Sequence, residues 1–412
     1  MTRMKESGID WIGQIPEEWE SGKVKYFSKI SAGATPDRNN LLFWNGDINW
    51  MSSGEVNQEI VKYTAETITN LALKKSSTKL LPIGTVMLAM NGQGKTKGTV
   101  AILAIETASN QSLASFIVDG NRLNNQYLYY FFKAGYSYIR GLKGEDRDGL
   151  NLQLVSNITV LLFDIKEQQK IADFLDKKTT QLDKVKSLLE EQIQKLKDYR
   201  SSLIYETVTK GLDKTVPMKD SGIDWIGQVP EGWGVSRLKY YFDIYAGGDI
   251  DERNTVEEYS ESHPYPVLSN SLENEGVLGY TNKYRFKKNC VTVTGRGDVG
   301  KAVYRNIKFY PVVRLLVCVP KSQVDCRFVT YWINSAIIEK NQTAVSQLTI
   351  QMLRELIFVN VPFLEQKNIA DFLDKKTNQI DKLIQIKNQQ IDNINKQRQT
   401  LIYDYVTGKK RA

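Results

Sequence analysis

The sequence is poor in the residues that most enzyme and metal sites need. It has one histidine, His263, and three cysteines, Cys290, Cys318 and Cys326. An odd number of cysteines without C-x-x-C spacing predicts neither a disulfide framework nor a zinc site. The histidine lies in the sequence SHPYP, which is typical of a loop. We expect it to have a structural role, which leaves no histidine for a Ser-His-Asp triad.

Long hydrophobic runs are also missing. No run of about 18 apolar residues occurs, so we expect no membrane-spanning helix. The first residues, MTRMKESGIDW, lack the apolar stretch of a secretory signal, and we therefore expect a cytoplasmic protein. The 412 residues, 41% of them hydrophobic, are enough for two or three domains with buried cores. A net charge of +8 favours a polyanionic partner such as nucleic acid.

The strongest feature of the sequence is an internal repeat. Residues 4–19, MKESGIDWIGQIPEEW, return as residues 218–233, MKDSGIDWIGQVPEGW, with 13 of 16 positions identical. Residues 167–184 return as residues 365–382, with 14 of 18 positions identical. Between these anchors the two halves hardly match. The chain is therefore a duplication in which one frame was kept and the middle of each half diverged, as expected if the frame presents two different surfaces.

Each half has the same predicted organisation. Short β-branched runs bounded by Gly, Asn and Asp predict strands at 84–90, 97–103 and 112–118 and in the matching part of the second half, and a helix is predicted around 124–140. We therefore predict an α+β fold with two mixed α/β domains separated by two long helices, related by a pseudo-two-fold axis. The predicted segments are an opening segment at 1–19, a first domain at 20–165, a first helix at 166–210, a linker with the repeated segment at 211–233, a second domain at 234–364 and a second helix at 365–408.

The two long helices are predicted to pair with each other. Apolar residues recur at seven-residue spacing in both copies, a pattern typical of a coiled coil. Two such helices in one chain can pair antiparallel, which is the arrangement we predict. Val185 and Tyr199 follow two of the leucines by three positions, and Lys387 replaces the middle member of the second copy. The alternative is that each helix packs only on its own domain. The predicted pairing positions, which would also carry partner subunits, are Leu175, Leu182, Leu189, Leu196, Leu203, Leu373, Ile380, Ile394 and Leu401.

Residues 295–300, GRGDVG, match the dinucleotide pattern G-x-G-x-x-G. A dinucleotide site needs these glycines to open a helix, whereas the next residues, KAVYRN, predict a strand. A nucleotide site is therefore disfavoured. Two interpretations stay open: an ordinary turn between strands, or a DNA-facing loop in which Arg296 contacts guanine and Lys301 contacts a phosphate.

Residues 91–96, NGQGKT, resemble the end of a phosphate-binding loop. That pattern needs Gly at position 89, where the chain has Ala89, and a strand again follows. The segment is either a solvated turn or a loop that contacts a DNA groove. The candidate DNA-binding residues, including two in the polar loops SNS and SQLT, are Gln93, Lys95, Thr96, Lys97, Asn270, Arg296, Lys301 and Gln347.

Catalysis by this chain is disfavoured because the sequence lacks the residue motifs that known active sites need. Pro36 and Asp37 resemble the start of a nuclease carboxylate pair, but no D/E-x-K follows within the next hundred residues. We predict no catalytic residue and no metal ligand, and we keep a stand-alone nuclease with its own DNA reader as the alternative. A coiled-coil adaptor that does not contact DNA is a third possibility. The aromatic run YLYYFF at 127–132 has helical spacing and is predicted to be core.

The duplicated frame resembles the specificity subunit of type I restriction-modification enzymes. Both copies carry GIDWIGxxPExW, and both carry EQ, IADFLDKKT and DK followed by LIYxxVT, so the resemblance covers essentially the whole chain. Within the first middle, residues 33–36 (GATP), 43–50 (FWNGDINW) and 110–111 (NQ) resemble a target-recognition-domain pattern. The family usually has a proline-containing strand before each EQ. Residues 361–364 (VPFL) keep it and residues 161–166 (LLFDIK) do not, so the first helix is expected to begin differently.

The resemblance implies a non-catalytic DNA-binding subunit. The two middles would be target-recognition domains, each reading one half of a bipartite, asymmetric DNA site. The helices would set the spacer and dock two modification subunits, which supply S-adenosylmethionine-dependent adenine methylation. Restriction subunits, with ATP and magnesium, would join the same complex. No cofactor is expected on this chain.

Overall fold

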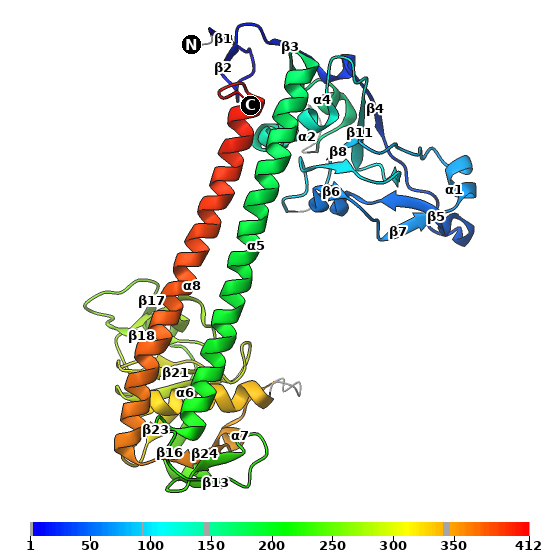
Figure 1. The fold of residues 1–412 in the computed structure, drawn as a ribbon. Coiled ribbons are helices and arrows are strands. Elements are labelled where there is room, and N and C mark those ends of the chain that lie inside the picture. Colours follow the sequence, from blue (N-terminus) through cyan, green and yellow to red (C-terminus); the bar gives the residue numbers. More distant parts are fainter. Residues whose placement is uncertain (1–2, 93, 144–148, 341–346, 412) are drawn as a thin grey trace. The chain divides into compact units, whose positions relative to one another are not determined.

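The protein is described by a computed structural model that covers residues 3–92, 94–143, 149–340 and 347–411 (Figure 1). Its contacts divide the chain into two compact units. Unit 1 is Met1–Leu189 with Gln389–Ala412, and unit 2 is Glu190–Asn388. Because the division falls within the two long helices, each helix contributes one part to each unit.

Unit 1 is a mixed α/β structure. Its strands are β1 (Met4–Glu6), β2 (Gln14–Pro16), β3 (Glu20–Lys23), β4 (Ser28–Ala32), β5 (Trp44–Met51), β6 (Ile60–Val61), β7 (Glu66–Ile68), β8 (Val86–Ala89), β9 (Val100–Leu103), β10 (Ala108–Ser109), β11 (Leu113–Val118) and β12 (Thr159–Leu162). Its shorter helices are α1 (Asn70–Lys75), α2 (Asn125–Ala134), α3 (Tyr136–Gly141) and α4 (Leu152–Ser156), with 3-10 turns η1 (Val24–Tyr26), η2 (Leu41–Phe43) and η3 (Ser53–Gln58).

Unit 2 has a similar order of elements, without a counterpart of β6 or α1. Its strands are β13 (Met218–Asp220), β14 (Gln228–Pro230), β15 (Gly234–Arg237), β16 (Phe242–Ala246), β17 (Thr255–Val256), β18 (Tyr265–Leu268), β19 (Val277–Thr281), β20 (Cys290–Thr294), β21 (Ala302–Arg305), β22 (Tyr310–Pro311), β23 (Leu315–Pro320) and β24 (Ile357–Asn360). Its helices are α6 (Cys326–Lys340) and α7 (Ile350–Arg354), with turns η4 (Leu238–Tyr240), η5 (Glu252–Asn254) and η6 (Glu273–Gly276).

The central sheets of the two units are built alike. One sheet in unit 1 has the order β4-β11-β8-β9-β6, and its counterpart in unit 2 has the order β16-β23-β20-β21. In unit 1, Ala114 of β11 pairs with Ala32 and with Leu88. In unit 2, Leu316 of β23 pairs with Ala246 and Val293 in the same way. The strands predicted at 84–90, 97–103 and 112–118 and the mixed α/β fold class are thus confirmed, and β6 is an addition in unit 1.

The remaining sheets also correspond. In unit 1 the order β10-β5-β7 brings β10 parallel to β5, and in unit 2 the order β17-β19-β18-β22 brings β22 parallel to β18. Strand β3 pairs with β12, and β15 pairs with β24. These pairs bring the first strand after each repeated opening segment next to the strand that precedes each long helix.

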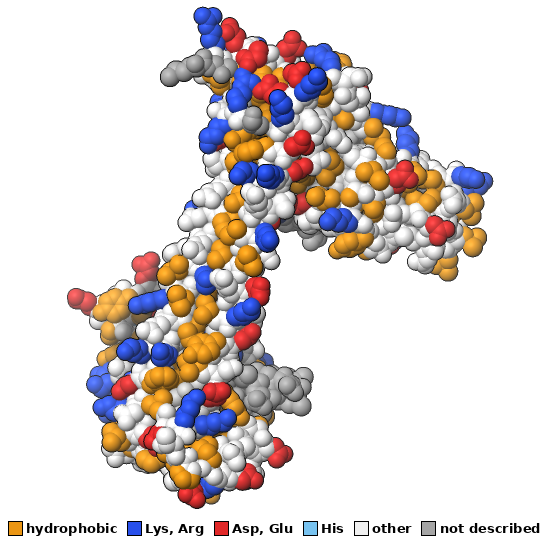
Figure 2. Space-filling model, in the orientation of Figure 1, with side chains coloured by type: hydrophobic (Ala, Val, Ile, Leu, Met, Phe, Trp, Pro, Cys, Tyr) orange, Lys and Arg blue, Asp and Glu red, His pale blue; other side chains and the backbone are white. Residues whose placement is uncertain are grey.

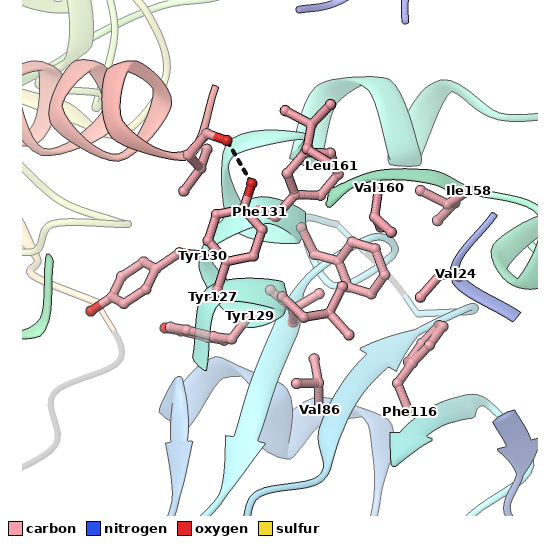
Figure 3. Close-up of a cluster of buried hydrophobic side chains, with 14 of the residues drawn as sticks. Val24, Val86, Phe116, Tyr127, Tyr129, Tyr130, Phe131, Ile158, Val160 and Leu161 are labelled. Carbon is pink, nitrogen blue, oxygen red and sulfur yellow. Dashed lines mark hydrogen bonds between the residues drawn. The ribbon is translucent and has the colours of Figure 1, made fainter. Parts of the chain in front are cut away.

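The aromatic run at 127–132 lies on α2 and forms the core of unit 1. All six of its side chains are buried, as the helical spacing predicts. The hydroxyl of Tyr127 donates to the carbonyl oxygen of Val406, at 2.8 Å. Figure 3 shows Tyr127 and Phe131 of α2 near Val86, Phe116, Val160 and Leu161 of neighbouring strands, while the rings of Tyr129 and Tyr130 extend away from these strand residues.

The long helices are α5 (Ile165–Lys210) and α8 (Phe363–Val406). In unit 1 the Phe174 and Tyr405 rings lie 4.4 Å apart, and Arg398 lies 3.4 Å from Asp183. Within unit 1, residue numbers on α8 therefore fall as those on α5 rise, so the two segments are antiparallel.

Unit 2 shows the same antiparallel packing between the other parts of the two helices. Arg200 lies 3.2 Å from Asp381, and Lys387 donates to Gln192 at 2.6 Å. The heptad position that carries Lys387 is thus occupied by a polar contact between the helices. Val185 and Tyr199, expected beside the pairing positions, are 47% and 56% exposed and lie outside them.

The N-termini of the two helices are formed by different residues, as the missing proline before α5 suggests. The Asp164 side chain accepts hydrogen bonds from the backbone N–H groups of Lys166 and Glu167, at 2.9 and 3.0 Å. Pro362 stands at the matching place before α8, where its fixed φ suits a helix start. Helix α8 runs from Phe363 to Val406, and not from 365 to 408 as predicted, because Gly408 adopts a left-handed φ of 72°.

Candidate nucleic-acid interface

The two loops that the sequence singles out occupy the same place in the two units. The segment around Lys95 joins β8 to β9, and the segment around Arg296 joins β20 to β21. Gly98 donates to the carbonyl of Ala89 at 2.8 Å, and Gly300 donates to that of Thr294 at 2.7 Å. Two loops with unrelated sequences therefore close the same hairpin of the shared frame.

The unit 1 hairpin loop is held by α3. Arg140 donates to the carbonyls of Gly94 and Lys97, at 2.7 and 3.2 Å, and the Tyr136 hydroxyl donates to that of Lys95 at 2.9 Å. The side chain of Lys95 is exposed, and those of Thr96 and Lys97 are half-buried. Gln93, the remaining candidate, lies outside the described residues. The loop thus has a fixed backbone with polar side chains at its surface.

A second segment reaches this edge of unit 1 through Gly33. A Cβ atom at Gly33 would lie 2.1 Å from the carbonyl oxygen of Ser109, so only glycine allows these two backbone segments to approach this closely. Gly247 repeats the arrangement in unit 2, 1.9 Å from the carbonyl oxygen of Val312. Beyond the crossing in unit 1, Thr35 donates to the side chain of Gln111 at 2.6 Å. The residues GATP and NQ therefore lie together.

The unit 2 hairpin gathers three of the candidates. Asn270 accepts from the backbone N–H of Gly295 at 2.8 Å and donates to the carbonyl of Val313 at 3.2 Å. Arg296 is exposed and lies 3.5 Å from the side-chain oxygen of Gln347. Asn270, Arg296 and Gln347 thus come from three separate loops and meet at one edge.

Lys301 lies at the base of the same hairpin, where its backbone N–H donates to Thr294 Oγ1 at 2.9 Å. Its side chain is half-buried. The structure therefore places Lys301 directly before β21, at the base of the hairpin and not at the loop tip.

Sequence reasoning missed Arg314 at this edge. It is exposed, has a left-handed φ of 73°, and directly precedes β23. The carbonyl oxygen of its neighbour Val313 accepts the hydrogen bond from the Asn270 side chain. The signal was present, because a basic residue stood between the apolar pairs VV and LL, but the run looked like one continuous strand.

The residues weighed for catalysis have local roles. The Asp37 carboxylate accepts from the backbone N–H of Asn39 at 3.0 Å, which stabilises a turn. His263 Nδ1 lies 3.0 Å from the hydroxyl of Ser262. Burial raises the pKa of Cys290 to about 11 and that of Cys326 to about 12, so both thiols are protonated near neutral pH. Within the described residues, no group of three or more His, Cys, Asp or Glu side chains is placed to hold a metal ion.

The helix-pairing candidates are all at least partly covered. Leu175, Leu373 and Ile380 are buried. The half-buried ones are Leu182, Leu189, Leu196, Leu203, Ile394 and Leu401. Within the residues the structure covers, no helix is both long enough and apolar enough to span a membrane. Figure 2 shows Lys and Arg side chains scattered over the visible face of both units, with Asp and Glu between them.

Solved structures share this fold. A chain from a study of complex assembly and conformational transition of the type I R-M system matches with a TM-score of 0.77 and 14% identity, covering 96% of this chain and 99% of that one. The HsdS subunit from Thermoanaerobacter tengcongensis matches with a TM-score of 0.56 and 14% identity, covering 96% of this chain and 98% of the other.

Sequence relatives point the same way. The type I restriction enzyme MjaIX specificity subunit of Methanocaldococcus jannaschii is 26% identical over 65% of this chain and 60% of its own length. A type I specificity subunit of Mycoplasma pneumoniae, S.MpnORF89P, is 36% identical over 28% of this chain and 35% of its length. The chain thus spans between about a third and three-fifths of these two relatives. It spans 94% of the MjaVIII specificity subunit of M. jannaschii, at 22% identity.

The family comparison covers most of the chain. The sequence profile of the type I restriction modification DNA specificity domain matches residues 16–197 and again residues 230–396. The two matches coincide with the two halves of the duplication. The chain belongs to the family of type I restriction modification DNA specificity domains.

Proposed function

We propose that this chain is the DNA-specificity subunit of a type I restriction-modification complex. Its two recognition domains would each read one half of a bipartite, asymmetric DNA site. One observation carries the proposal: the same hairpin of the same frame carries an unrelated polar loop in each unit. A shared frame with two different reading loops is the arrangement that a site with two different halves requires.

The chemistry of the two edges supports direct contact with bases. Arg296 with Gln347 in unit 2, and Lys95 with Thr96 in unit 1, offer donors of the kind that pair with purine edges in the major groove. The excess positive charge supplies the attraction to phosphates, which is independent of sequence. We infer that α5 and α8, which run unbroken from one unit into the other, set the number of base pairs left unread between the half-sites.

We propose that the reactions belong to other subunits. Two modification subunits would dock on the paired helices and methylate adenine with S-adenosylmethionine, and restriction subunits would use ATP and magnesium. This chain would hold none of these cofactors and would act in the cytoplasm, where the DNA is. The relatives named as specificity subunits of type I restriction enzymes support this assignment.

The test is the methylome of cells that express this chain with its modification subunit. We expect one split adenine-methylated motif, with two different halves around a fixed unread spacer. Exchanging residues 91–97 for the matching loop of a relative with a known motif should change one half only. A contiguous palindromic motif, or a loop exchange that changes both halves at once, would refute the proposal.

Purified chain without partners provides a second test. DNA affinity should fall by about 10³-fold or more between about 50 and 200 mM salt if six or more phosphates are contacted. Salt-independent binding would favour an adaptor that does not contact DNA. Cleavage of DNA by the chain alone with magnesium would favour the stand-alone nuclease.

A further inference from the structure

An ion-pair network in unit 1 connects the recognition domain to both long helices. Glu59, between η3 and β6, lies 2.6 Å from Lys133 of α2 and 2.7 Å from Arg398 of α8. Arg398 also lies 3.4 Å from Asp183 of α5. We call Glu59, Lys133 and Arg398 the domain latch. One carboxylate of the recognition domain thus holds a cation of its own core helix and a cation of α8.

The backbone of the latch is strained. Glu59 has φ 60° and ψ −51°, a conformation that residues other than glycine rarely adopt. Its N–H donates to Val56 at 3.1 Å, and its carbonyl accepts from Ile102 of β9 at 2.9 Å. Strain of this kind persists where the surroundings hold the residue in place, and it is concentrated at functional positions. Glu59 is therefore fixed by its backbone as well as by its carboxylate.

The latch has a partly desolvated electrostatic centre. The Lys133 and Arg398 side chains are 19% and 16% exposed, whereas that of Glu59 is 44% exposed. Partial burial raises the pKa of Glu59, but attraction to Lys133 and hydrogen bonds from Arg398 and Lys133 outweigh it and lower the pKa to about 2. Burial lowers the pKa of Lys133 to about 8, since the attraction of Glu59 is partly cancelled by repulsion from Arg398. Glu59 is therefore fully ionised at neutral pH and forms ion pairs with both Lys133 and Arg398.

A cavity of about 770 Å³ lies beside the latch within unit 1. It is lined by the three latch residues and by segments of β9, α3 and α8. Ile402, one turn further along α8, also lines this cavity and is buried in the core of unit 1. Beside the cavity, the ion pairs of Arg398 are a second, polar connection between the domain and α8.

Unit 2 keeps the helix pair and lacks the latch. Arg200 and Asp381 repeat the pair of Arg398 and Asp183, at the same offset of 198 residues, since 398 − 200 and 381 − 183 both give 198. Asn334 stands where unit 1 has Lys133, and it bonds to the backbone of Ala302. The described residues of unit 2 have no strand that pairs as β6 does, and Glu275, which shares the left-handed φ of Glu59, lies near Arg305 of its own domain.

In unit 2, ion pairs connect the domain to the first part of α8, which corresponds to the first part of α5 in unit 1. Arg327 of α6 contacts Asp371 and Asp374 at 2.7 and 2.9 Å, whereas unit 1 has Gln126 at the matching place. The ion pairs between the domain and the long helices therefore involve different, non-matching residues in the two halves. A contact that served only to pair the helices would have been kept in both.

We propose that Glu59 and Arg398 are positioning residues that fix where the first recognition domain meets its half-site along the helices, and so select the spacer length rather than the bases. This assignment rests on the proposed function. One base pair of spacer moves a half-site by about 3.4 Å along the duplex and turns it by about 35°. A domain held by a strained, ion-paired residue resists such a displacement, and a released domain accommodates it.

The experiment measures binding of the complex with its modification subunits to DNA duplexes that carry the methylome-derived half-sites. The spacers are the native one and ones that are one base pair shorter or longer. Wild type should prefer the native spacer. Because losing one partner of a partly buried charge pair typically costs tenfold or more in binding, Glu59→Gln should reduce that preference by about tenfold. The base preference within each half-site should not change.

Three further variants separate the outcomes. Glu66→Gln removes an exposed ion pair with Arg38 in the same domain and should leave the spacer preference unchanged. Arg398→Gln should reduce the spacer preference at least as much as Glu59→Gln, because it also removes the pair with Asp183, and the double variant should lose no more than Arg398→Gln alone. Equal loss of binding at all spacers, with the preference kept, would assign the latch a purely structural role and overturn the proposal. If wild type bound no split site at all, the proposed function itself would fail.

Discussion

The crossing at Gly33 allows a sharp test of the frame that the two units share. A Cβ atom added at Gly33 would lie 2.1 Å from the carbonyl oxygen of Ser109, and one added at Gly247 would lie 1.9 Å from that of Val312. The ordinary carbon–oxygen contact distance is about 3.3 Å. Alanine at either position therefore forces the two backbone segments that cross there apart by more than about 1 Å.

The expected loss of stability follows from which atoms collide. Overpacking a well-packed site costs about 1–3 kcal/mol, and here both atoms belong to the backbone, so no side chain can rotate away. We expect Gly33→Ala to cost about 3 kcal/mol. In a unit of about 200 residues this lowers the melting temperature by about 6–12 °C.

The assay is thermal unfolding of the purified chain, followed by circular dichroism or calorimetry. Gly54→Ala and Gly232→Ala are the matched controls in units 1 and 2, because an added Cβ meets nothing within 4 Å at either position. Both controls should melt within about 2 °C of wild type, as surface substitutions usually do. If Gly33→Ala also melted in that range, the close crossing, and with it the argument that both units share one frame, would be refuted.

Three other perturbations test separate parts of the structure. Arg296→Ala should weaken DNA binding by about 1–3 kcal/mol and relax base preference in the second half-site only, measured by titration of variant duplexes. Leu175→Ala and Leu373→Ala, at fully buried matching positions of α5 and α8, should each lower the free energy of unfolding in urea by about 2–5 kcal/mol, whereas Leu364→Ala, at a 70% exposed position, should not. Because Lys133 and Arg398 outweigh the effect of burial and lower the pKa of Glu59 from 4.5 to about 2, its stabilisation is present above pH 4.5 and is lost as pH falls toward 2. Glu59→Gln should therefore flatten the acid limb of the stability profile, and an unchanged limb would show that Glu59 is not ion-paired.

Much of the fold could be predicted because its signals are local. The runs VMLA of β8 and VAIL of β9 are buried and read as strands from their composition alone. The aromatic run of α2 read as core because its side chains recur at helical spacing. The seven-residue spacing of α5 and α8 indicated paired helices, and it could do so because each helix repeats one pattern over its whole length.

The candidate site was only partly predictable because it depends on contacts between distant segments. That the loops at Lys95 and Arg296 close the same hairpin follows from strand register, which neither loop sequence contains. Asn270 and Gln347 were chosen as polar loop residues, and nothing in their own segments indicated that Arg296 would join them. Glu59 and Arg398 are 339 positions apart, and no local pattern links them.

The differences between the two halves then follow from what each contact has to do. The pairs Arg398–Asp183 and Arg200–Asp381 join the same two helices, and the residues of one pair repeat those of the other at an offset of 198 positions. The ion pairs between domain and helix are not repeated in this way, since Glu59–Arg398 occurs in unit 1 and Arg327–Asp374 in unit 2. Glu59 could therefore arise in unit 1 with the added strand β6, and Arg327 in unit 2, without disturbing the helix pair. The part of the chain that diverged is thus the part whose contacts could change one half at a time.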